Sequence, residues 1–183
     1  MIRNRHSRCI EATAAQGEAL LAGLGTDGDA LWPHERWPAM RFKEGLRLGA
    51  PGRHGPIRYT VKFKAPRVLT FHLTGPRGFV GWHGFEVAPE EIAGVRLIHR
   101  LHLQPRGWAR IYWPLALRWL HDACIRDALD KAQAHLEGHS WTPRPLSLWV
   151  RFLRRLLRRN PRPQPPTPRH EGAPSGSVAS QSA

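Results

Sequence analysis

Histidines in two strand-like stretches are the residues of this chain best suited to chemistry. The stretches GFVGWHGFEV (78–87) and AGVRLIHRLHL (93–103) place His83 and His99 in step with Phe, Val and Leu. Alternating apolar residues indicate strands with one buried face, so both imidazoles are expected to point inward. An imidazole partly removed from water titrates near neutral pH and can transfer protons. His83 and His99 are therefore candidate catalytic or ligand-contacting residues.

The pairing of these two strands follows from the turn between them. A turn centred on Glu91 would place His83 directly opposite His99, unless a bulge in either strand shifts the register. Directly opposed residues share a face, so the two imidazoles are predicted to be cross-strand neighbours. By the same alternation, His72 and His102 point to the other face.

Glu44 and His121 are the other candidates for the interior. Glu44 interrupts an alternating stretch at 40–48 and is expected to face inward, where burial would raise its pKa and fit it for acid–base work. The imidazoles and Glu44 then have three interpretations: catalysts, groups that orient a ligand, or hydrogen-bonded polar groups in an apolar pocket. His54, in a glycine-flanked loop, either covers the mouth of that pocket or is a surface turn residue.

Metal and cofactor chemistry lack a sequence signature. Three imidazoles from His83, His99 and His121 are a ligand set that zinc accepts, but the chain has neither an HxH nor an HExxH pattern, so no metal site is predicted. A phosphate-cradling GxxxxGK[ST] loop is also missing from the sequence. We therefore expect no cofactor.

The elements that must position these residues are strands followed by one long helix. Residues 57–64 alternate most clearly, and 68–74 form the next strand after a turn at 65–67. If that turn is symmetric, three apolar pairs face one another: Tyr59 with Leu73, Val61 with Phe71, and Phe63 with Leu69. The period then changes to 3.6 from about residue 108 to 137, which predicts a helix long enough to cross the sheet.

The wheel of this long helix separates two faces. One apolar stripe consists of Trp113, Leu117, Leu120, Cys124 and Ala128, with His121 on its shoulder. Asp122 falls on the opposite face in an i,i+4 ladder with Arg118 and Arg126, which favours a role as a surface ion-pair partner. Leu115 and Trp119 also lie on that polar face, so the first half of the helix needs a second covering surface.

Composition favours one soluble domain with an extension. The chain has 183 residues, 41% of them hydrophobic, and carries neither a signal-peptide pattern nor an apolar run of about 18 residues that could span a bilayer. Cys9 and Cys124 are far apart and give no disulfide or metal framework. A cytoplasmic location is expected, either free or at a membrane surface.

A basic amphipathic helix is predicted within residues 143–168. The net charge is +14, and eight of the 28 Lys and Arg residues follow His139. This helix either packs on Leu115 and Trp119 or attaches reversibly to an anionic membrane. A nucleic-acid partner is disfavoured because aromatic residues for base stacking are sparse. The residues expected at a membrane are Trp149, Arg151, Leu153, Arg154, Arg155, Arg158 and Arg159. Residues 161–183 are expected to be disordered.

The order of elements, with LWP…RWPAMRF, GLRLGAPGRHGPIRY, GFVGWHGFEV and WLHDACIRDALDKA, resembles the helix-grip superfamily called SRPBCC, which includes START-related lipid-transfer domains and polyketide cyclases. The resemblance covers about residues 5 to 138. It implies an α+β fold in which a curved antiparallel sheet wraps around the last long helix, with two short helices after the first strand.

That resemblance also implies a ligand. In the superfamily, the space between sheet and helix commonly holds a hydrophobic small molecule, and no catalytic residues are shared by all members. The residues expected to contact such a molecule are Phe42, Tyr59, Val61, Phe71, His83, Phe85, Leu97, His99, Trp113, Leu117 and His121. The alternative is a cyclase or dehydratase that uses His83, His99 or Glu44 as acid and base. A further alternative is that side chains such as Trp82 and Trp113 fill the space, leaving no pocket of ligand size.

The expected organisation is therefore a helix-grip domain at 1–138, a basic amphipathic extension at 139–160, and a Pro/Ser/Gly-rich tail at 161–183. The expected partners are a hydrophobic small molecule and an anionic membrane surface, and the expected state is a monomer or a homodimer.

Overall fold

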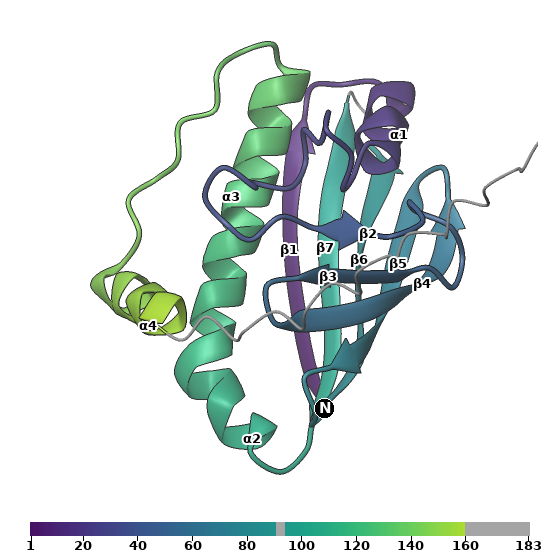
Figure 1. The fold of residues 1–183 in the computed structure, drawn as a ribbon. Helices are drawn as coiled ribbons and strands as arrows, with labels where there is room; N and C mark the ends of the chain where they lie inside the picture. Colours follow the sequence, from purple (N-terminus) through teal and green to yellow (C-terminus); the bar gives the residue numbers. More distant parts are fainter. Residues whose placement is uncertain (91–93, 160–183) are drawn as a thin grey trace, which may run out of the picture.

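The computed structural model describes residues 1–90 and 94–159, in which a seven-stranded antiparallel sheet packs against a long helix (Figure 1). The strands are β1 (Ile2–Ile10), β2 (Arg41–Phe42), β3 (Pro51–His54), β4 (Ile57–Ala65), β5 (Val68–Gly75), β6 (Phe79–Pro89) and β7 (Val95–Pro105). The helices are α1 (Ala14–Ala22), α2 (Ala109–Tyr112), the π-helical segment η1 (Trp113–Leu117), α3 (Arg118–Leu136) and α4 (Leu148–Arg159).

The sheet order is β1-β7-β6-β5-β4-β3-β2, so the first strand pairs with the last. The remaining strands follow one another as a meander, and α3 runs along the β1 side of the sheet (Figure 1). One apolar core joins the inner face of the sheet to α3 and α1. The predicted α+β helix-grip architecture is confirmed, although only α1 among the predicted pair of short helices forms before β2 in the described residues.

The long helix covers the predicted range but is not uniform. α2, η1 and α3 follow one another without a break from Ala109 to Leu136. The π-helical segment contains Pro114, whose backbone has no N–H to donate, and the helix widens there as π segments do. The predicted apolar stripe faces the sheet: Trp113, Leu120, Cys124 and Ala128 are all buried.

A bulge changes the β4–β5 hairpin near its turn. Tyr59 lies opposite Leu73 and Val61 opposite Phe71, as the symmetric turn predicts. The register then shifts between Val61 and Phe63, so Phe63 lies opposite Thr70 rather than Leu69. The prediction of an inward Phe63 is wrong, because the extra residue turns its side chain outward, where it is 51% exposed.

The β6–β7 hairpin keeps the predicted faces but not the predicted partners. His83 lies opposite Leu101 and His99 opposite Phe85, which is a shift of two residues from the predicted register. Because side chains alternate with a period of two, this shift leaves both imidazoles on the inner face. The predicted turn centre, Glu91, lies outside the described residues.

The predicted strand at 40–48 is mostly irregular. β2 retains only Arg41 and Phe42, and the chain turns immediately afterwards. Glu44 is exposed and its carboxylate lies 2.6 Å from Arg47, so the prediction that Glu44 faces the interior is wrong. Gly45, with φ of +68°, lies in the turn that follows the end of β2 at Phe42.

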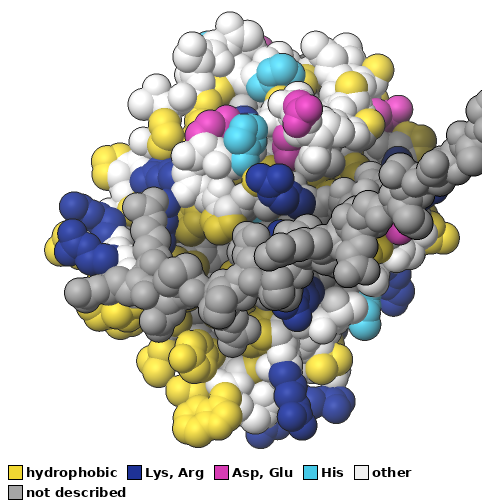
Figure 2. Space-filling model, in the orientation of Figure 1, with side chains coloured by type: hydrophobic (Ala, Val, Ile, Leu, Met, Phe, Trp, Pro, Cys, Tyr) yellow, Lys and Arg dark blue, Asp and Glu magenta, His cyan; other side chains and the backbone are white. Residues whose placement is uncertain are grey.

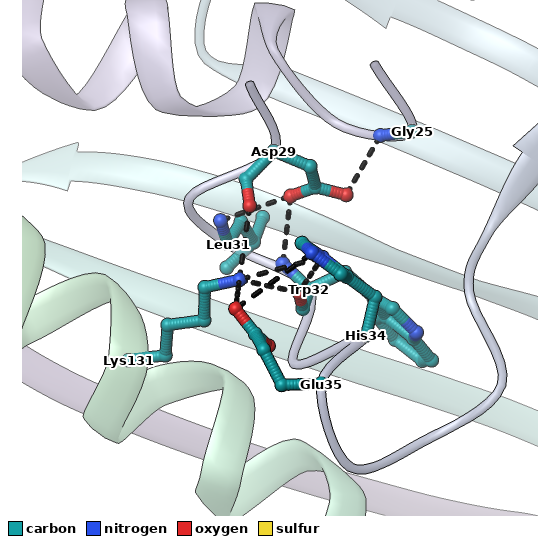
Figure 3. Close-up of polar contacts among 7 residues, drawn as sticks. All are labelled: Gly25, Asp29, Leu31, Trp32, His34, Glu35 and Lys131. Carbon is teal, nitrogen blue, oxygen red and sulfur yellow. Dashed lines mark hydrogen bonds and ion pairs between the residues drawn. The ribbon is translucent and has the colours of Figure 1, made fainter. Parts of the chain in front are cut away.

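A buried lysine fixes the segment between α1 and β2 (Figure 3). Lys131 of α3 donates hydrogen bonds to the carbonyls of Asp29 and Trp32 and to the carboxylate of Glu35, at 3.0, 2.9 and 2.8 Å. The Asp29 carboxylate accepts backbone N–H bonds from Gly25, Leu31 and Trp32. These bonds hold the Trp32 ring 4.9 Å, centre to centre, from the imidazole of His54.

The basic helix α4 packs on the domain. Val150 and Leu153 are buried, and Arg154 lies over the Trp37 ring while donating to the carbonyl of Arg36. The prediction that Leu153 and Arg154 contact a membrane is therefore wrong, because both face the protein. The side chains of Arg158 and Arg159 and the whole of 160–183, including the predicted disordered tail, lie outside the described residues.

Candidate functional site

Five imidazoles form a row through the interior, and each belongs to a different element. His54 comes from β3, His83 from β6, His99 from β7, His121 from α3 and His6 from β1. Successive ring centres are 6.2, 5.7, 5.1 and 6.1 Å apart in that order. The structure thus brings together the three predicted histidines and adds one at each end.

The middle of the row is surrounded by apolar rings. His83 is 5% exposed and His99 is fully buried. Phe71 and Tyr59 lie against His83, with ring centres 5.1 and 5.4 Å away, and Phe85 lies 4.9 Å from His99. We call His83, His99 and His121 the imidazole cluster.

Several nitrogens of the imidazole cluster have no hydrogen-bond partner among the described residues. These buried atoms are Nε2 of His83, both Nδ1 and Nε2 of His99, and Nε2 of His121. A buried polar atom without a partner costs about 1–3 kcal/mol, and folded proteins keep few of them. The cluster is therefore the part of the interior best equipped to bond a polar group that is not part of the chain.

Burial keeps these imidazoles neutral. The pKa of His83 and the pKa of His99 lie well below the ordinary value, first because burial disfavours the charged ring and then because the other imidazoles repel a proton. Burial, aided by His121, also lowers the pKa of His54 to about 3. Burial lowers the pKa of His121 too, although the Asp122 carboxylate partly opposes this. At neutral pH the cluster offers uncharged rings that can donate or accept one hydrogen bond at each nitrogen.

The protein is expected to lose stability as the pH falls below about 6.5, the ordinary histidine value. The unfolded chain binds protons there, whereas folded His83 and His99 do not, so acid favours unfolding. Each ring contributes a slope of up to about 1.4 kcal/mol per pH unit. Denaturant unfolding between pH 7 and 5 measures this slope. The slope should fall in His83→Leu and persist in His72→Leu, whose histidine is exposed; a pH-independent unfolding midpoint would contradict the assignment.

The outer end of the row is a hydrogen-bonded carboxylate. Asp122 Oδ1 lies 3.1 Å from His6 Nε2 and 3.4 Å from His121 Nδ1, and it accepts a 2.9 Å bond from Asn4. Burial acts to raise the pKa of Asp122, but the bonds from His121 and His6 outweigh it and hold that pKa below its usual range.

Asp122, His6 and His121 also have a composition that zinc accepts, and their ligand atoms lie within 4.8 Å of one another. Asp122 is already bonded by Asn4 and lies 3.7 Å from the Arg118 guanidinium, which supplies a positive charge. Hydrogen bonds and this ion pair account for the positions of these three side chains, so we assign no metal to Asp122, His6 and His121. The predicted Arg118–Asp122 ladder is present, but Asp122 faces β1 as well as solvent.

The predicted ligand-contacting residues occupy the inner layer but pack closely on one another. The buried members are Tyr59, Val61, Phe71, Phe85, Leu97 and Trp113, whereas Phe42 and Leu117 are partly buried. Two open hollows in the described residues lie elsewhere. One, of about 550 Å³, lies between α1 and the β4–β5 turn, and the other, of about 380 Å³, lies beside β1 and η1.

For the two ends of the row, the sequence left His54 open between a cover of the pocket and a surface turn residue, and it did not indicate His6. His54 is not a surface turn residue: its ring packs between Trp32 and Tyr59, with Nδ1 3.4 Å from the Tyr59 hydroxyl. His6 was not among the residues predicted to lie in the interior. The alternation of Ile2, Asn4, His6, Arg8 and Ile10 on one face was the signal that would have found it.

Comparison with known proteins supports the fold alone. No family model matches the chain, and no curated protein matches its sequence. Among solved structures, a protein of Nitrosospira multiformis aligns with a TM-score of 0.57 at 12% identity, over 74% of this chain and 96% of its own. Truncated norcoclaurine synthase from Thalictrum flavum aligns with a TM-score of 0.57 at 12% identity, over 76% and 95%.

A START superfamily protein from Mycobacterium smegmatis also matches, with a TM-score of 0.47 at 12% identity, over 74% of this chain and 97% of its own. The seven-stranded sheet, the long C-terminal helix and the alignments at a TM-score of 0.57 agree with one another. The chain therefore has a helix-grip fold.

Proposed function

We propose that the protein binds an amphipathic small molecule between the sheet and α3, with the polar end of the molecule at the imidazole cluster. The observation that carries this proposal is the set of buried, partnerless nitrogens on His83, His99 and His121. Neutral imidazoles pair with hydroxyl, phenol or carbonyl groups, while the surrounding Phe71 and Phe85 suit an apolar body.

Entry of such a molecule requires the inner layer to open, because its side chains are in contact. The weakest covering segment runs from β2 to β3. β2 pairs with β3 through only Arg41 and Phe42, and Phe42 stacks on Tyr59 and Phe71, with ring centres 5.7 and 5.6 Å away. Short pairing with little burial marks segments that open at low free-energy cost. Displacing Phe42 would expose Tyr59 and Phe71, which lie beside His83.

Native mass spectrometry of the protein purified from its own host tests this function. We expect a population heavier by the mass of one small molecule, and we expect that population to disappear in His83→Leu, which removes a bonding group at similar volume. The control is His72→Leu, on the opposite face of β5, which should retain the added mass. A wild-type protein that carries no added mass, or a mass retained in His83→Leu, would contradict the proposal.

An acid–base enzyme of the cyclase or dehydratase type is the second candidate. It is supported by the approach of His54 Nδ1 to the Tyr59 hydroxyl, at 3.4 Å. The lowered pKa of His83 weighs against it, because an imidazole whose pKa lies well below the working pH is a weak proton acceptor. One solved structure with this fold is a synthase, which shows that the fold accommodates catalysis in that protein. Glu44 has no part in this candidate because it is exposed. Ligand affinity retained in His83→Leu together with lost turnover would identify an enzyme.

A further inference from the structure

Large apolar side chains remain exposed along α2, η1 and the first turn of α3, and on α4, whose Trp149 contacts η1 at Leu115. The members on the first helical segments are Trp108, Ile111, Tyr112, Leu115 and Trp119, which are 47% to 77% exposed. The members on α4 are Trp149, Phe152, Leu156 and Leu157, which are 45% to 54% exposed. We call these nine side chains the aromatic surface.

The two halves of the aromatic surface touch each other. The Trp149 indole donates a 3.0 Å hydrogen bond to the carbonyl of Leu115, and its ring stacks on Phe152. Burial of Val150 and Leu153 holds α4 in this position. Figure 2 shows hydrophobic side chains gathered at the lower left, the region where Figure 1 places α4 and α2. Exposed apolar patches of this extent mark interaction sites on soluble proteins.

Arginines surround the aromatic surface. Arg106, Arg110, Arg118, Arg151 and Arg155 are exposed on the same elements or next to them. Figure 2 shows Lys and Arg side chains flanking the hydrophobic cluster on the left and at the bottom. The hollow of about 380 Å³ opens beside it and is lined by Arg3, Arg110 and Arg118 together with Trp113 and Pro114. Guanidinium groups in such an arrangement suit phosphate oxygens.

We propose that the aromatic surface docks on an anionic lipid bilayer, with a lipid phosphate in the arginine-lined hollow. Trp and Tyr side chains favour the headgroup layer, and each arginine near an anionic surface contributes about 1 kcal/mol. The described residues contain no helix long and apolar enough to cross a membrane, so attachment is to the surface. α4, at 12 residues, spans about 18 Å, well short of the apolar thickness of a bilayer.

The chemistry of the surface argues against other occupants. A nucleic acid would leave the aliphatic side chains of Ile111, Leu156 and Leu157 against charged backbone phosphates. A second copy of the chain would bring two arginine borders together, and like charges facing each other disfavour association. Of these three occupants, a bilayer is the one that offers both negative charge at the border and apolar chains at the centre. This attachment stands apart from ligand binding at the imidazole cluster, and either can fail without the other.

Sedimentation of the full chain with lipid vesicles tests the proposal. We expect binding to vesicles of phosphatidylcholine with phosphatidylglycerol, weakened by salt, and little binding to phosphatidylcholine alone. Arg110→Gln combined with Arg118→Gln should weaken binding about 30-fold, from two lost contacts. Trp108→Ala combined with Tyr112→Ala should also weaken it without affecting folding, because both side chains are exposed.

A matched control carries the same change in net charge at the far edge of the sheet. Arg41→Gln combined with Arg53→Gln removes two exposed, cross-strand arginines of β2 and β3 and should leave vesicle binding unchanged. Equal loss in control and test variants would overturn the proposal, because charge alone would then explain binding. Sedimentation velocity without lipid that shows a dimer disrupted by Trp108→Ala and Tyr112→Ala, with no vesicle binding, would assign the surface to a second copy instead.

Discussion

Replacing His99 with leucine is expected to raise the free energy of unfolding by about 1–3 kcal/mol and, at the same time, to remove ligand binding. Both ring nitrogens of His99 are buried and partnerless among the described residues, so the histidine has lost its hydration without a replacement bond. Leucine fills a similar volume next to Phe85 and has no polar atoms to desolvate. A residue that weakens the fold fits a functional role better than a packing role.

Urea unfolding at pH 7 measures the stability part, and native mass spectrometry measures the ligand part. His72→Leu is the control, because its exposed ring should change the free energy of unfolding by less than about 0.5 kcal/mol. A His99→Leu protein that is less stable than wild type would show that this ring contributes favourable contacts. The imidazole cluster would then be ordinary core structure.

Replacing Lys131 with methionine is expected to lower the free energy of unfolding by about 3 kcal/mol. Methionine keeps most of the apolar stem but removes the ammonium group that binds the carbonyls of Asp29 and Trp32 (Figure 3). The Asp29 carbonyl then loses its bond to Lys131, whereas the Trp32 carbonyl keeps the 2.8 Å bond from the backbone N–H of His34. The segment that presses Trp32 on His54 should loosen as well, so the change is expected to reach the end of the histidine row.

Glu35→Gln tests the ion pair of the Lys131 ammonium separately from its hydrogen bonds to the two carbonyls. The Glu35 side chain is 49% exposed, so its ion pair with Lys131 is screened by water, and the variant should lose less than about 1 kcal/mol. Urea unfolding of both variants, with the fluorescence of the tryptophans as the signal, makes the comparison. Equal losses in Lys131→Met and Glu35→Gln would mean that the ion pair, and not the two carbonyl bonds, carries the stability.

The fold was largely predictable because the alternation of apolar residues in strands and the 3.6-residue period in helices repeat over many positions. The alternation of Tyr59 and Val61 predicted the buried face of β4. The 3.6-residue period of residues 108–137 predicted the length of the long helix and its inner stripe. The bulge at Phe63 was not predictable in the same way. A bulge inserts one residue without changing the composition of either strand, so a pattern of alternating residues carries no trace of it.

The centre of the candidate site was predicted, whereas His54 was left open between two placements and His6 was not predicted. A two-residue shift of register preserves the face, so His83 and His99 were correctly placed inside although their direct pairing was wrong. His54 depends on long-range packing against Trp32, which no local pattern contains. The placement of Glu44 was wrong because a short apolar stretch was interpreted as a full strand. The strand ends at Phe42, and the chain then turns through Gly45.

The pairing of β1 with β7 has a consequence for the chain as it is synthesised. Ile2 lies opposite Leu103, so the first strand to leave the ribosome has no partner until about a hundred residues have followed it. An unpaired strand exposes a full row of backbone N–H and C=O groups that other chains can capture. That strand contains Arg3, Arg5 and Arg8. Repulsion between these arginines on neighbouring nascent chains opposes such capture. The same arginines thus protect the polypeptide during translation, before the domain can close.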